Sequence, residues 1–440
     1  MSDIVLLLSV PGLREKDIDR MPNLKSLASA GDCSQLAPSF PAVTWPVQAN
    51  MLTGELASAH GVTANGFYWR DSHEVEMWTA WNEKIERPQI WDLLHQHDSQ
   101  LTSAVWFPML SKGCGADYVC MPAPVHNPDG SESLWCYTKP TEYYGQLLEE
   151  FGHFPLKHFW GPLANIKSTK WIAETGAFAA SQLKPRFFFL YLPHLDYAAQ
   201  KDGPESEQAQ KACEELDQII GLMMSKFSSA YSGDRLLWLV ASEYTIGEVD
   251  SVTYPNRVLR QAGLLTTISD NDSKELIDFE STPAWALVDH QFSHVYVKDA
   301  EDIGRVVDLF RGMDGIDEVL TRESSDVYGM NHERSGEVIL ISEPNSWQAY
   351  YWWNDNNLAP AFARTVDIHR KPGYDPVELH FDFANKETPL DATLIRGSHG
   401  APAKLASQRG VLVSSEKGVL PASTLADTDV CEIVLRQFGI

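Results

Sequence analysis

The 440-residue sequence is short of cysteine pairs, long hydrophobic runs and positive charge. Its six cysteines are scattered and none forms a C-x-x-C pair, which excludes a zinc knuckle and a thioredoxin-like redox motif. The N-terminal apolar run covers only residues 4–10, has no basic segment before it and ends in Pro-Gly, so it predicts a buried strand rather than a signal peptide or a membrane span. We therefore expect a cytoplasmic protein that has no membrane partner.

The shortage of positive charge limits the kinds of molecule that the protein surface can bind. The chain has 35 Lys and Arg residues against 60 Asp and Glu residues, which gives a formal net charge of −25. Such a surface repels nucleic-acid backbones, so we expect no nucleic-acid partner. A small phosphorylated substrate remains compatible with this charge if the binding pocket supplies a cation, and a bound metal ion would be one such cation.

What the sequence does have is an alternation of buried strands and helices. Apolar runs typical of strands covered on both faces occupy residues 4–10, 186–192 and 235–242, with a further strand predicted within 102–109. Helical patterns cover residues 21–31, 46–57, 171–183 and 207–227. This alternation predicts an α/β core with a mostly parallel sheet flanked by helices. Reactive groups in such a sheet lie past the carboxyl ends of its strands.

Two regions depart from this alternation. Residues 110–165 show weak periodicity, and we expect a long irregular excursion near the mouth of the pocket. From about residue 283 the pattern changes to short strands, such as 293–299 and 336–344, around one helix. Polar motifs resume after it, so we predict a small α+β cap, residues 283–359, inserted into a core made of residues 1–282 and 360–440.

Thr44 is the candidate nucleophile. It lies in FPAVTWPVQANMLTGELASAHG, residues 40–61, directly before a predicted helix start at Trp45-Pro46. An alcohol needs a base or a metal ion to act as a nucleophile at neutral pH, and a helix N-terminus can support an anionic oxygen. The alternative is that Thr44 simply caps the helix, because Thr is an ordinary capping residue before such a start.

Several possible metal ligands follow separate strands. Asp196 comes after the run 186–192, Glu243 follows the run 235–242, and His399 lies between small residues in RGSHG. Asp367 and His369, two apart in RTVDIHRK, would share one face if that segment is extended. Each has an ordinary structural alternative. Together they predict a divalent cation, Zn or Mn, as one or two ions. The cluster Asp289, His290 and His294 opens the predicted cap and carries less weight.

The order of these motifs resembles the alkaline phosphatase superfamily, most closely its type I phosphodiesterase/nucleotide pyrophosphatase branch, over nearly the whole chain. The resemblance implies an alkaline-phosphatase-like core with a cap. It places the nucleophile on Thr44 and a phosphate-holding residue on Asn65, in TANGFYWR. It places metal ligands on Asp196 in DYAAQKDGP, on Glu243 in SEYTI and on His399 in GSHG.

Four metal-ligand positions depart from the family pattern. Pro11, Gln200 and Tyr244 occupy positions where the family has ligands, and Glu243 occupies the position of an Asp. The usual two-zinc site therefore cannot be built from the usual residues. Asp367 and His369 are the best candidates to complete a rearranged site, with His194 a weaker one. The segment VDIHRKPGYDP and the S-E-Y motif also resemble a divergent bacterial group of the superfamily.

Three functions remain open. The first is metal-dependent hydrolysis of a phosphodiester, pyrophosphate or phosphomonoester through a covalent phosphothreonine. The second is a catalytically impaired module that binds a phosphorylated or anionic ligand. The third is phosphoryl or sulfuryl transfer, or phosphonate hydrolysis. The first is the function we expect. The aromatic-rich segments 65–71 and 348–355 could contact a substrate, but we expect packing roles for them.

Overall fold

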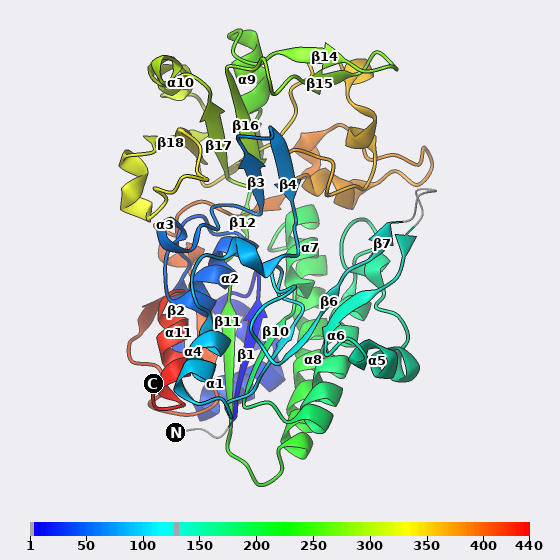
Figure 1. The fold of residues 1–440 in the computed structure, drawn as a ribbon, viewed down its shortest axis with the longest axis vertical. Helices are drawn as coiled ribbons and strands as arrows, with labels where there is room; N and C mark the ends of the chain where they lie inside the picture. Colours follow the sequence, from blue (N-terminus) through cyan, green and yellow to red (C-terminus); the bar gives the residue numbers. More distant parts are fainter. Residues whose placement is uncertain (1–3, 127–131) are drawn as a thin grey trace.

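The structure is a computed structural model that describes residues 4–126 and 132–440. It has two parts, one built on a nine-stranded sheet and one on a four-stranded sheet (Figure 1). The larger part lies below in the view, and the smaller part stands above the upper ends of its strands. Among the described residues, no helix combines the length and the apolar character needed to cross a membrane.

The large sheet is α/β and mostly parallel, as the sequence predicts. Its order is β23-β2-β22-β11-β1-β10-β5-β6-β9, and the five strands from β11 to β6 are parallel to one another. The strands are β1 (Ile4–Val10), β2 (Cys33–Ala37), β5 (Ser103–Trp106), β6 (Tyr118–Pro122), β9 (Cys136–Lys139), β10 (Phe187–Tyr191), β11 (Leu236–Ser242), β22 (Gly410–Ser414) and β23 (Thr424–Ala426).

Helices cover both faces of this sheet. Successive side chains of β1 point to opposite faces, so Leu6 and Leu8 enter one hydrophobic core while Val5 and Leu7 enter the other. The first core is covered by α1 (Pro22–Ala30), α5 (Tyr143–Phe151), α6 (Ile166–Leu183) and α8 (Glu207–Ala230). The second is covered by α2 (Thr44–Thr53), α4 (Ile90–His97) and α11 (Asp429–Arg436). Burial on both faces explains why the strand runs are continuously apolar.

Two local predictions need correction. The single helix predicted over residues 46–57 is two helices, α2 and α3 (Ala57–His60), because Gly54 ends α2 with a φ of +74°. The excursion predicted over residues 110–165 is not irregular throughout, since it contains β6, β9 and α5. Its strands are short and lie at the edge of the sheet, which is why they carry little periodicity. Residues 127–131 of that stretch lie outside the described residues.

The smaller part is an antiparallel sheet with its own hydrophobic core. The order is β16-β17-β19-β18, from β16 (Ala284–Asp289), β17 (Phe292–Val297), β18 (Ile316–Thr321) and β19 (Val338–Ser342), with α10 (Ile303–Phe310) packed against it. The strands predicted within 293–299 and 336–344 are therefore present. Its core also takes in Tyr68 and Met77 from the hairpin of β3 (Gly66–Trp69) and β4 (Glu74–Met77), which stands beside β16 and β17 in Figure 1.

This second core extends beyond the predicted cap. It includes residues from Val249 to Ile395 in addition to the β3–β4 hairpin. The boundaries 283–359 therefore stay a prediction for the inserted unit. The remaining α-helices are α7 (His194–Asp202) and α9 (Pro255–Gln261). The remaining strands are β7 (Val125–His126), β8 (Glu132–Ser133), β12 (Gly247–Glu248), β13 (Ser251–Thr253), β14 (Thr267–Ser269), β15 (Glu275–Ile277), β20 (Ser346–Gln348) and β21 (Gly397–Ser398).

Candidate active site

Thr44 is the first residue of α2. The residue before it, Val43, occupies the capping position, and no side chain caps the helix. The alternative that Thr44 serves only as a cap is therefore wrong. The Thr44 hydroxyl lies 3.1 Å from the Tyr244 hydroxyl, just beyond the carboxyl end of β11. Only 6% of Thr44 is exposed, so a reaction at this oxygen would take place in a nearly dry site.

Asn65 holds the start of α2. Its side-chain carbonyl accepts the Trp45 N–H at 3.0 Å, and its own backbone and side-chain N–H groups donate to Asp289 at 2.8 and 3.2 Å. Pro46 has no N–H group. The second and third residues of the helix therefore offer no free N–H to an anion. The predicted role of Asn65 in holding phosphate oxygens stays a prediction.

A chain of hydrogen bonds leads from Thr44 to Asp196 in the first turn of α7. The Tyr244 hydroxyl donates to Asp196 Oδ1 at 3.3 Å, so it accepts the bond from Thr44. Gln200, one turn later, donates to Asp196 Oδ2 at 2.8 Å and accepts from the Tyr374 hydroxyl at 2.6 Å. Gln200 and Tyr244 occupy positions where the resemblance implies metal ligands. In this structure both side chains donate hydrogen bonds to the Asp196 carboxylate.

Both acidic groups near Thr44 hold their protons unusually tightly. Burial raises the pKa of Asp196 to about 7, although the bonds from Tyr244 and Gln200 act in the opposite direction. Burial likewise raises the pKa of Glu243 to about 8, against the bonds that Ser9 and Gln48 donate to its Oε1 at 2.6 and 2.8 Å. Glu243 Oε2 is buried and has no hydrogen-bond partner among the described residues.

His399 completes the group around Asp196. Its Nδ1 donates to the Ala42 carbonyl at 2.8 Å, so Nε2 carries the lone pair. Nε2 lies 3.8 Å from Asp196 Oδ1 and, within the described part of the chain, has no hydrogen-bond partner. The ring stacks on Tyr244 with centroids 3.6 Å apart. Burial lowers the pKa of His399 well below its usual value, so the ring is neutral.

Asp367 and His369 do not join this group. The segment turns at this point instead of running extended, and Asp367 Oδ1 accepts the backbone N–H groups of His369 and Arg370. Asp367 also pairs with the Arg370 guanidinium, while His369 Nδ1 binds the Met77 carbonyl at 3.2 Å. His194 binds Glu215 at 2.8 Å. The roles predicted for these side chains as metal ligands stay predictions.

The residues around Thr44 do not fit the family's pair of metal ions. Within residues 4–126 and 132–440, no three His, Cys, Asp or Glu side chains are grouped so that they could hold an ion. Asp196 and His399 do approach each other, with 3.8 Å between Asp196 Oδ1 and His399 Nε2. A structural zinc site uses four protein ligands and a catalytic site three.

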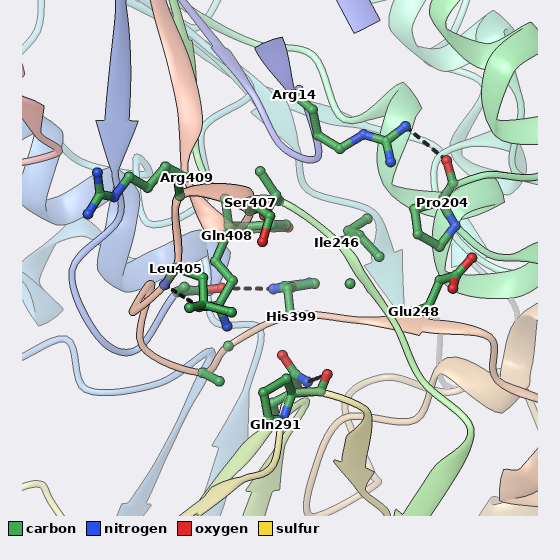
Figure 2. A pocket seen from close by; sticks show the side chains of 18 of the residues that line it. Arg14, Pro204, Ile246, Glu248, Gln291, His399, Leu405, Ser407, Gln408 and Arg409 are labelled. Carbon is green, nitrogen blue, oxygen red and sulfur yellow. Dashed lines mark hydrogen bonds between the residues drawn. The ribbon is translucent and has the colours of Figure 1, made fainter. Parts of the chain in front are cut away.

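Thr44 opens into a small, mostly aromatic cavity of about 80 Å³. Its wall is formed by Thr44, Trp78, Met109, Phe159, Trp160, Tyr191, Asp196, Tyr197, Tyr244, His290, Ile368 and Tyr374. A larger and more open cavity of about 710 Å³ shares Tyr244 with it. Figure 2 shows His399 in the wall of this larger cavity, among Ile246, Gln291 and Ser407. Tyr244 lines both cavities and therefore lies between them.

The two aromatic-rich segments have packing roles, as expected. Tyr350, Tyr351, Trp352 and Trp353 are at most 1% exposed and belong to the core of the smaller part. In the other segment, Phe67 packs against Trp45 with ring centroids 5.9 Å apart. The aromatic wall of the small cavity comes instead from scattered positions, of which Trp160 and Tyr197 are two.

The cavity that contains Thr44 is also lined by His290, which was given little weight from the sequence, and by Tyr374, which the sequence does not single out. His290 lies in the turn between β16 and β17, and its ring stacks on Tyr374 with centroids 3.6 Å apart. The available signal was His-Gln as a two-residue turn between apolar strands, where Gly or Asn is usual.

The fold is that of the alkaline phosphatase superfamily. The family model for type I phosphodiesterase / nucleotide pyrophosphatase matches residues 5–375, and the chain belongs to that family. Among curated relatives, mouse ectonucleotide pyrophosphatase/phosphodiesterase family member 7 is 24% identical over 257 residues, which are 56% of this chain and 50% of the relative. Bis(5'-adenosyl)-triphosphatase enpp4 of Xenopus laevis is 21% identical over 68% of this chain and 60% of its own.

Solved structures with the same fold cover almost the whole chain. Phosphonoacetate hydrolase from Sinorhizobium meliloti 1021, bound to phosphonoformate, has a TM-score of 0.64 and 15% identity and covers 99% of this chain and 96% of its own. Human ectonucleotide pyrophosphatase / phosphodiesterase 5 has a TM-score of 0.65 and 13% identity. The match covers 99% of this chain and 95% of the human chain. The chain spans about half the length of the first curated relatives it matches.

Proposed function

We propose that this protein hydrolyses phosphoric esters, with Thr44 as the nucleophile and a covalent phosphothreonine as the intermediate. The observation that carries the proposal is the hydrogen-bonded path from the Thr44 hydroxyl through Tyr244 to Asp196, with steps of 3.1 and 3.3 Å. As the Thr44 oxygen bonds to phosphorus, its proton moves to Tyr244 and the Tyr244 proton moves to Asp196. A carboxylate with a pKa near neutrality is well matched to this task.

Membership of the family supports the reaction type. The size of the cavity limits the substrate, because about 80 Å³ accommodates a reacting phosphoryl group and little more. The remainder of a larger ester would extend past the aromatic wall. Phosphodiesters, phosphomonoesters and phosphonates all carry a suitable group, and the solved relative that binds phosphonoformate makes phosphonates worth including.

The test is turnover of nitrophenyl phosphodiester, phosphomonoester and phosphonate substrates by the wild type and by Thr44→Ala. Loss of a nucleophile is expected to lower kcat by roughly 10⁴-fold or more. Thr53→Ala is the matched control, since Thr53 lies in the same helix and its hydroxyl binds the Ala49 carbonyl at 2.7 Å. Intact mass should show one transferred phosphoryl group on the wild type and none on Thr44→Ala.

The sequence-based prediction of Zn or Mn is tested in the same preparation. Metal content of the purified protein, and turnover before and after chelation, decide whether an ion takes part. Turnover that is equal in the wild type and in Thr44→Ala would rule out the proposed function. Binding of phosphate esters without turnover on any of the three substrate types would favour the binding module instead.

A further inference from the structure

The cavity in front of Thr44 has a polar inner part and an apolar mouth. The lining residues that are buried, which include Thr44, Asp196 and Tyr244, carry its ionisable and hydroxyl groups. The lining residues that are partly exposed form the mouth, and these are Trp78, Met109, Phe159, Trp160 and Ile368. In the described chain, the only polar side-chain groups of the mouth are indole N–H groups. A ligand whose charged group lies against Thr44 therefore meets an apolar surface on the way to solvent.

No Lys or Arg among the described residues lines this cavity. Two positive residues follow Ile368 closely in the chain, but both are engaged by acids. Arg370 pairs with Asp367, and the Lys371 ammonium lies 2.6 Å from Glu378 Oε1. Each further phosphate of a pyrophosphate or a nucleoside polyphosphate would bring negative charge to a mouth that offers no cation to balance it. The mouth therefore disfavours a substrate that carries a second phosphate group.

Trp160 is anchored in the mouth by a buried acid. Its Nε1 donates to Glu378 Oε2 at 2.7 Å, and the Glu378 side chain is only 1% exposed because it also pairs with Lys371. The indole packs against Tyr197 and Tyr374, with ring centroids 6.1 and 5.6 Å apart. Glu378 does not line the cavity, so the polar group of the indole is satisfied away from a ligand. What a ligand meets is the carbon surface of a ring that is already held in place.

Backbone strain also marks the mouth. Trp78 has a φ of +57°, a left-handed conformation that bulky residues rarely adopt. Its ring packs against Trp45 and Tyr374, with centroids 5.8 and 6.1 Å apart. Met109 directly precedes Leu110, whose φ is +52°. Non-glycine residues held in this conformation are concentrated at functional sites. The chain thus keeps large apolar residues at or beside positions where glycine would suit the backbone better.

Exposed apolar residues lie beside the mouth, in two segments that help to form it. Leu163, three positions after Trp160, is 44% exposed, and Val366, two positions before Ile368, is 40% exposed. The two segments touch, because a Cβ atom added at Gly161 would lie 3.1 Å from Val366 Cγ1. Apolar surface therefore continues from the mouth to the solvent, and an organic group that protrudes from the cavity stays in contact with it.

We propose that the substrates of this site are esters with a single phosphorus group and an aromatic or other apolar organic group, and that Trp160 selects them. This inference rests on the proposed function of Thr44. The phosphorus group fills the inner cavity of about 80 Å³, and the organic group lies in the mouth against Trp160. Removing its carbon surface from water supplies affinity, and an anchored indole has little conformational entropy left to lose. A sugar or a nucleobase would lose hydrogen bonds to water without finding partners in the mouth.

The test measures the affinity of the Thr44→Ala variant, which should not turn ligands over, by isothermal titration calorimetry. The ligands are phenylphosphonate, methylphosphonate and thymidine monophosphate, each of which carries one phosphorus group. Phenylphosphonate should bind about 10- to 100-fold more tightly than methylphosphonate, and more tightly than thymidine monophosphate. Equal binding of the two phosphonates, tightest binding of thymidine monophosphate, or no binding of any of the three would overturn the proposal.

Trp160→Ala, added to Thr44→Ala, tests the contact itself. It should weaken the binding of phenylphosphonate about 10-fold and leave that of methylphosphonate unchanged. Trp160→Phe keeps a ring but cannot donate to Glu378, and it should retain most of the preference for the phenyl group. Trp81→Ala is the matched control, since Trp81 is 47% exposed and does not line the cavity. It should change neither affinity. An equal loss for both phosphonates in Trp160→Ala would contradict the role of Trp160.

Failures of the two proposals are distinguishable, because binding of the phosphonates does not depend on catalysis. If the preference for the phenyl group is absent while the wild type turns over nitrophenyl esters and Thr44→Ala does not, only the substrate class is wrong. If Thr44→Ala turns over these esters as fast as the wild type, the proposed function fails and the substrate class inferred from it fails as well.

Discussion

Two buried groups of charged and polar side chains lie close to each other in this protein and are built in opposite ways. The Lys371 cluster, made of Lys371, Asp375 and Glu378, places one ammonium 2.8 Å from Asp375 Oδ2 and 2.6 Å from Glu378 Oε1. Trp160 donates to Glu378 Oε2 at 2.7 Å. The Thr44 cluster, made of Thr44, Asp196, Glu243, Tyr244 and His399, has two acids, no cation and two buried atoms without partners.

The pKa values follow this difference. Burial acts to lower the pKa of Lys371, but the carboxylates of Asp375 and Glu378 outweigh it and raise that pKa, so the charged form is favoured. In the Thr44 cluster burial dominates and raises the pKa values of Asp196 and Glu243. The first cluster therefore favours its charged groups, whereas in the second cluster the ionised forms of the acids are costly to stability.

The largest effect is expected for Asp196→Asn, which should lower turnover without lowering the free energy of unfolding. An amide can still accept from Tyr244 but cannot take the Thr44 proton, so turnover of a nitrophenyl ester should fall about 10²- to 10⁴-fold. At pH 8 Asp196 is largely ionised, so removing this buried charge should not lower the free energy of unfolding measured with denaturant.

Asp217→Asn is the matched control. Asp217 is also buried, but it accepts from Asn23 and Leu24 and belongs to α8, away from the cavity. The Asp217→Asn variant should have a lower free energy of unfolding and the turnover of the wild type. If Asp196→Asn lost stability as Asp217→Asn does, the contrast between the two clusters would be wrong.

Lys371→Met should produce the opposite result. Removing the ammonium leaves two buried carboxylates unpaired, and breaking such a pair lowers the free energy of unfolding by about 3–5 kcal/mol. Denaturant unfolding measures the loss. Lys404→Met is the matched control, since Lys404 also contacts two acids, Asp317 and Glu318, but its side chain is 47% exposed. There we expect a loss of about 0–1 kcal/mol. Equal losses in the two variants would contradict the structural role of the Lys371 cluster.

The sequence predicts the fold better than the site, and particular residues explain why. Continuous apolar runs such as 4–10 identify the central strands because both faces of the sheet are covered. Thr44, Asp196 and His399 are brought together as the order of motifs implies. Pairing Asp367 with His369 assumes an extended segment, whereas the backbone turns there and the buried charges of that segment are Lys371 and Asp375.

His290 shows a different limit. Its strand pattern was visible, but its place in the site depends on how the second core packs on the first, through contacts with Tyr374 and His399. These contacts join residues that are 84 and 109 positions apart in a chain that offers no local signal for them.

The contrast between fully and partly hydrogen-bonded buried groups extends to the histidines. Here we expect a smaller effect on the free energy of unfolding. His60 accepts the Val62 N–H on Nδ1 and donates from Nε2 to Asn50, and His294 likewise accepts from Gly336 and donates to the Thr63 carbonyl. Each of these rings is therefore neutral, and both of its nitrogen atoms are hydrogen-bonded. The His399 ring is also neutral, but its Nε2 has no hydrogen-bond partner among the described residues. Burial lowers the pKa of His60 to about 3 and that of His294 to about 4.

Because the folded-state pKa values lie below the unfolded value of 6.5, the unfolded chain binds these protons first. Stability should therefore be full above pH 6.5 and fall as pH is lowered towards 4 and 3. The expected loss is about 2 kcal/mol for each histidine between pH 7 and pH 5. Denaturant unfolding of the wild type and of a His60→Gln/His294→Gln variant at both pH values measures it. An equally steep fall in the variant would assign the loss to other groups.

The composition of the second core also affects the order in which the molecule can assemble. The second core takes Tyr68 and Met77 from a hairpin near the start of the chain, while the rest of its residues lie between Val249 and Ile395. A nascent chain therefore cannot complete the second core until segments as late as Ile395 have been made. Because His290 and Tyr374 line the cavity together with Thr44, the wall of this cavity can also form only after that late part of the chain has folded.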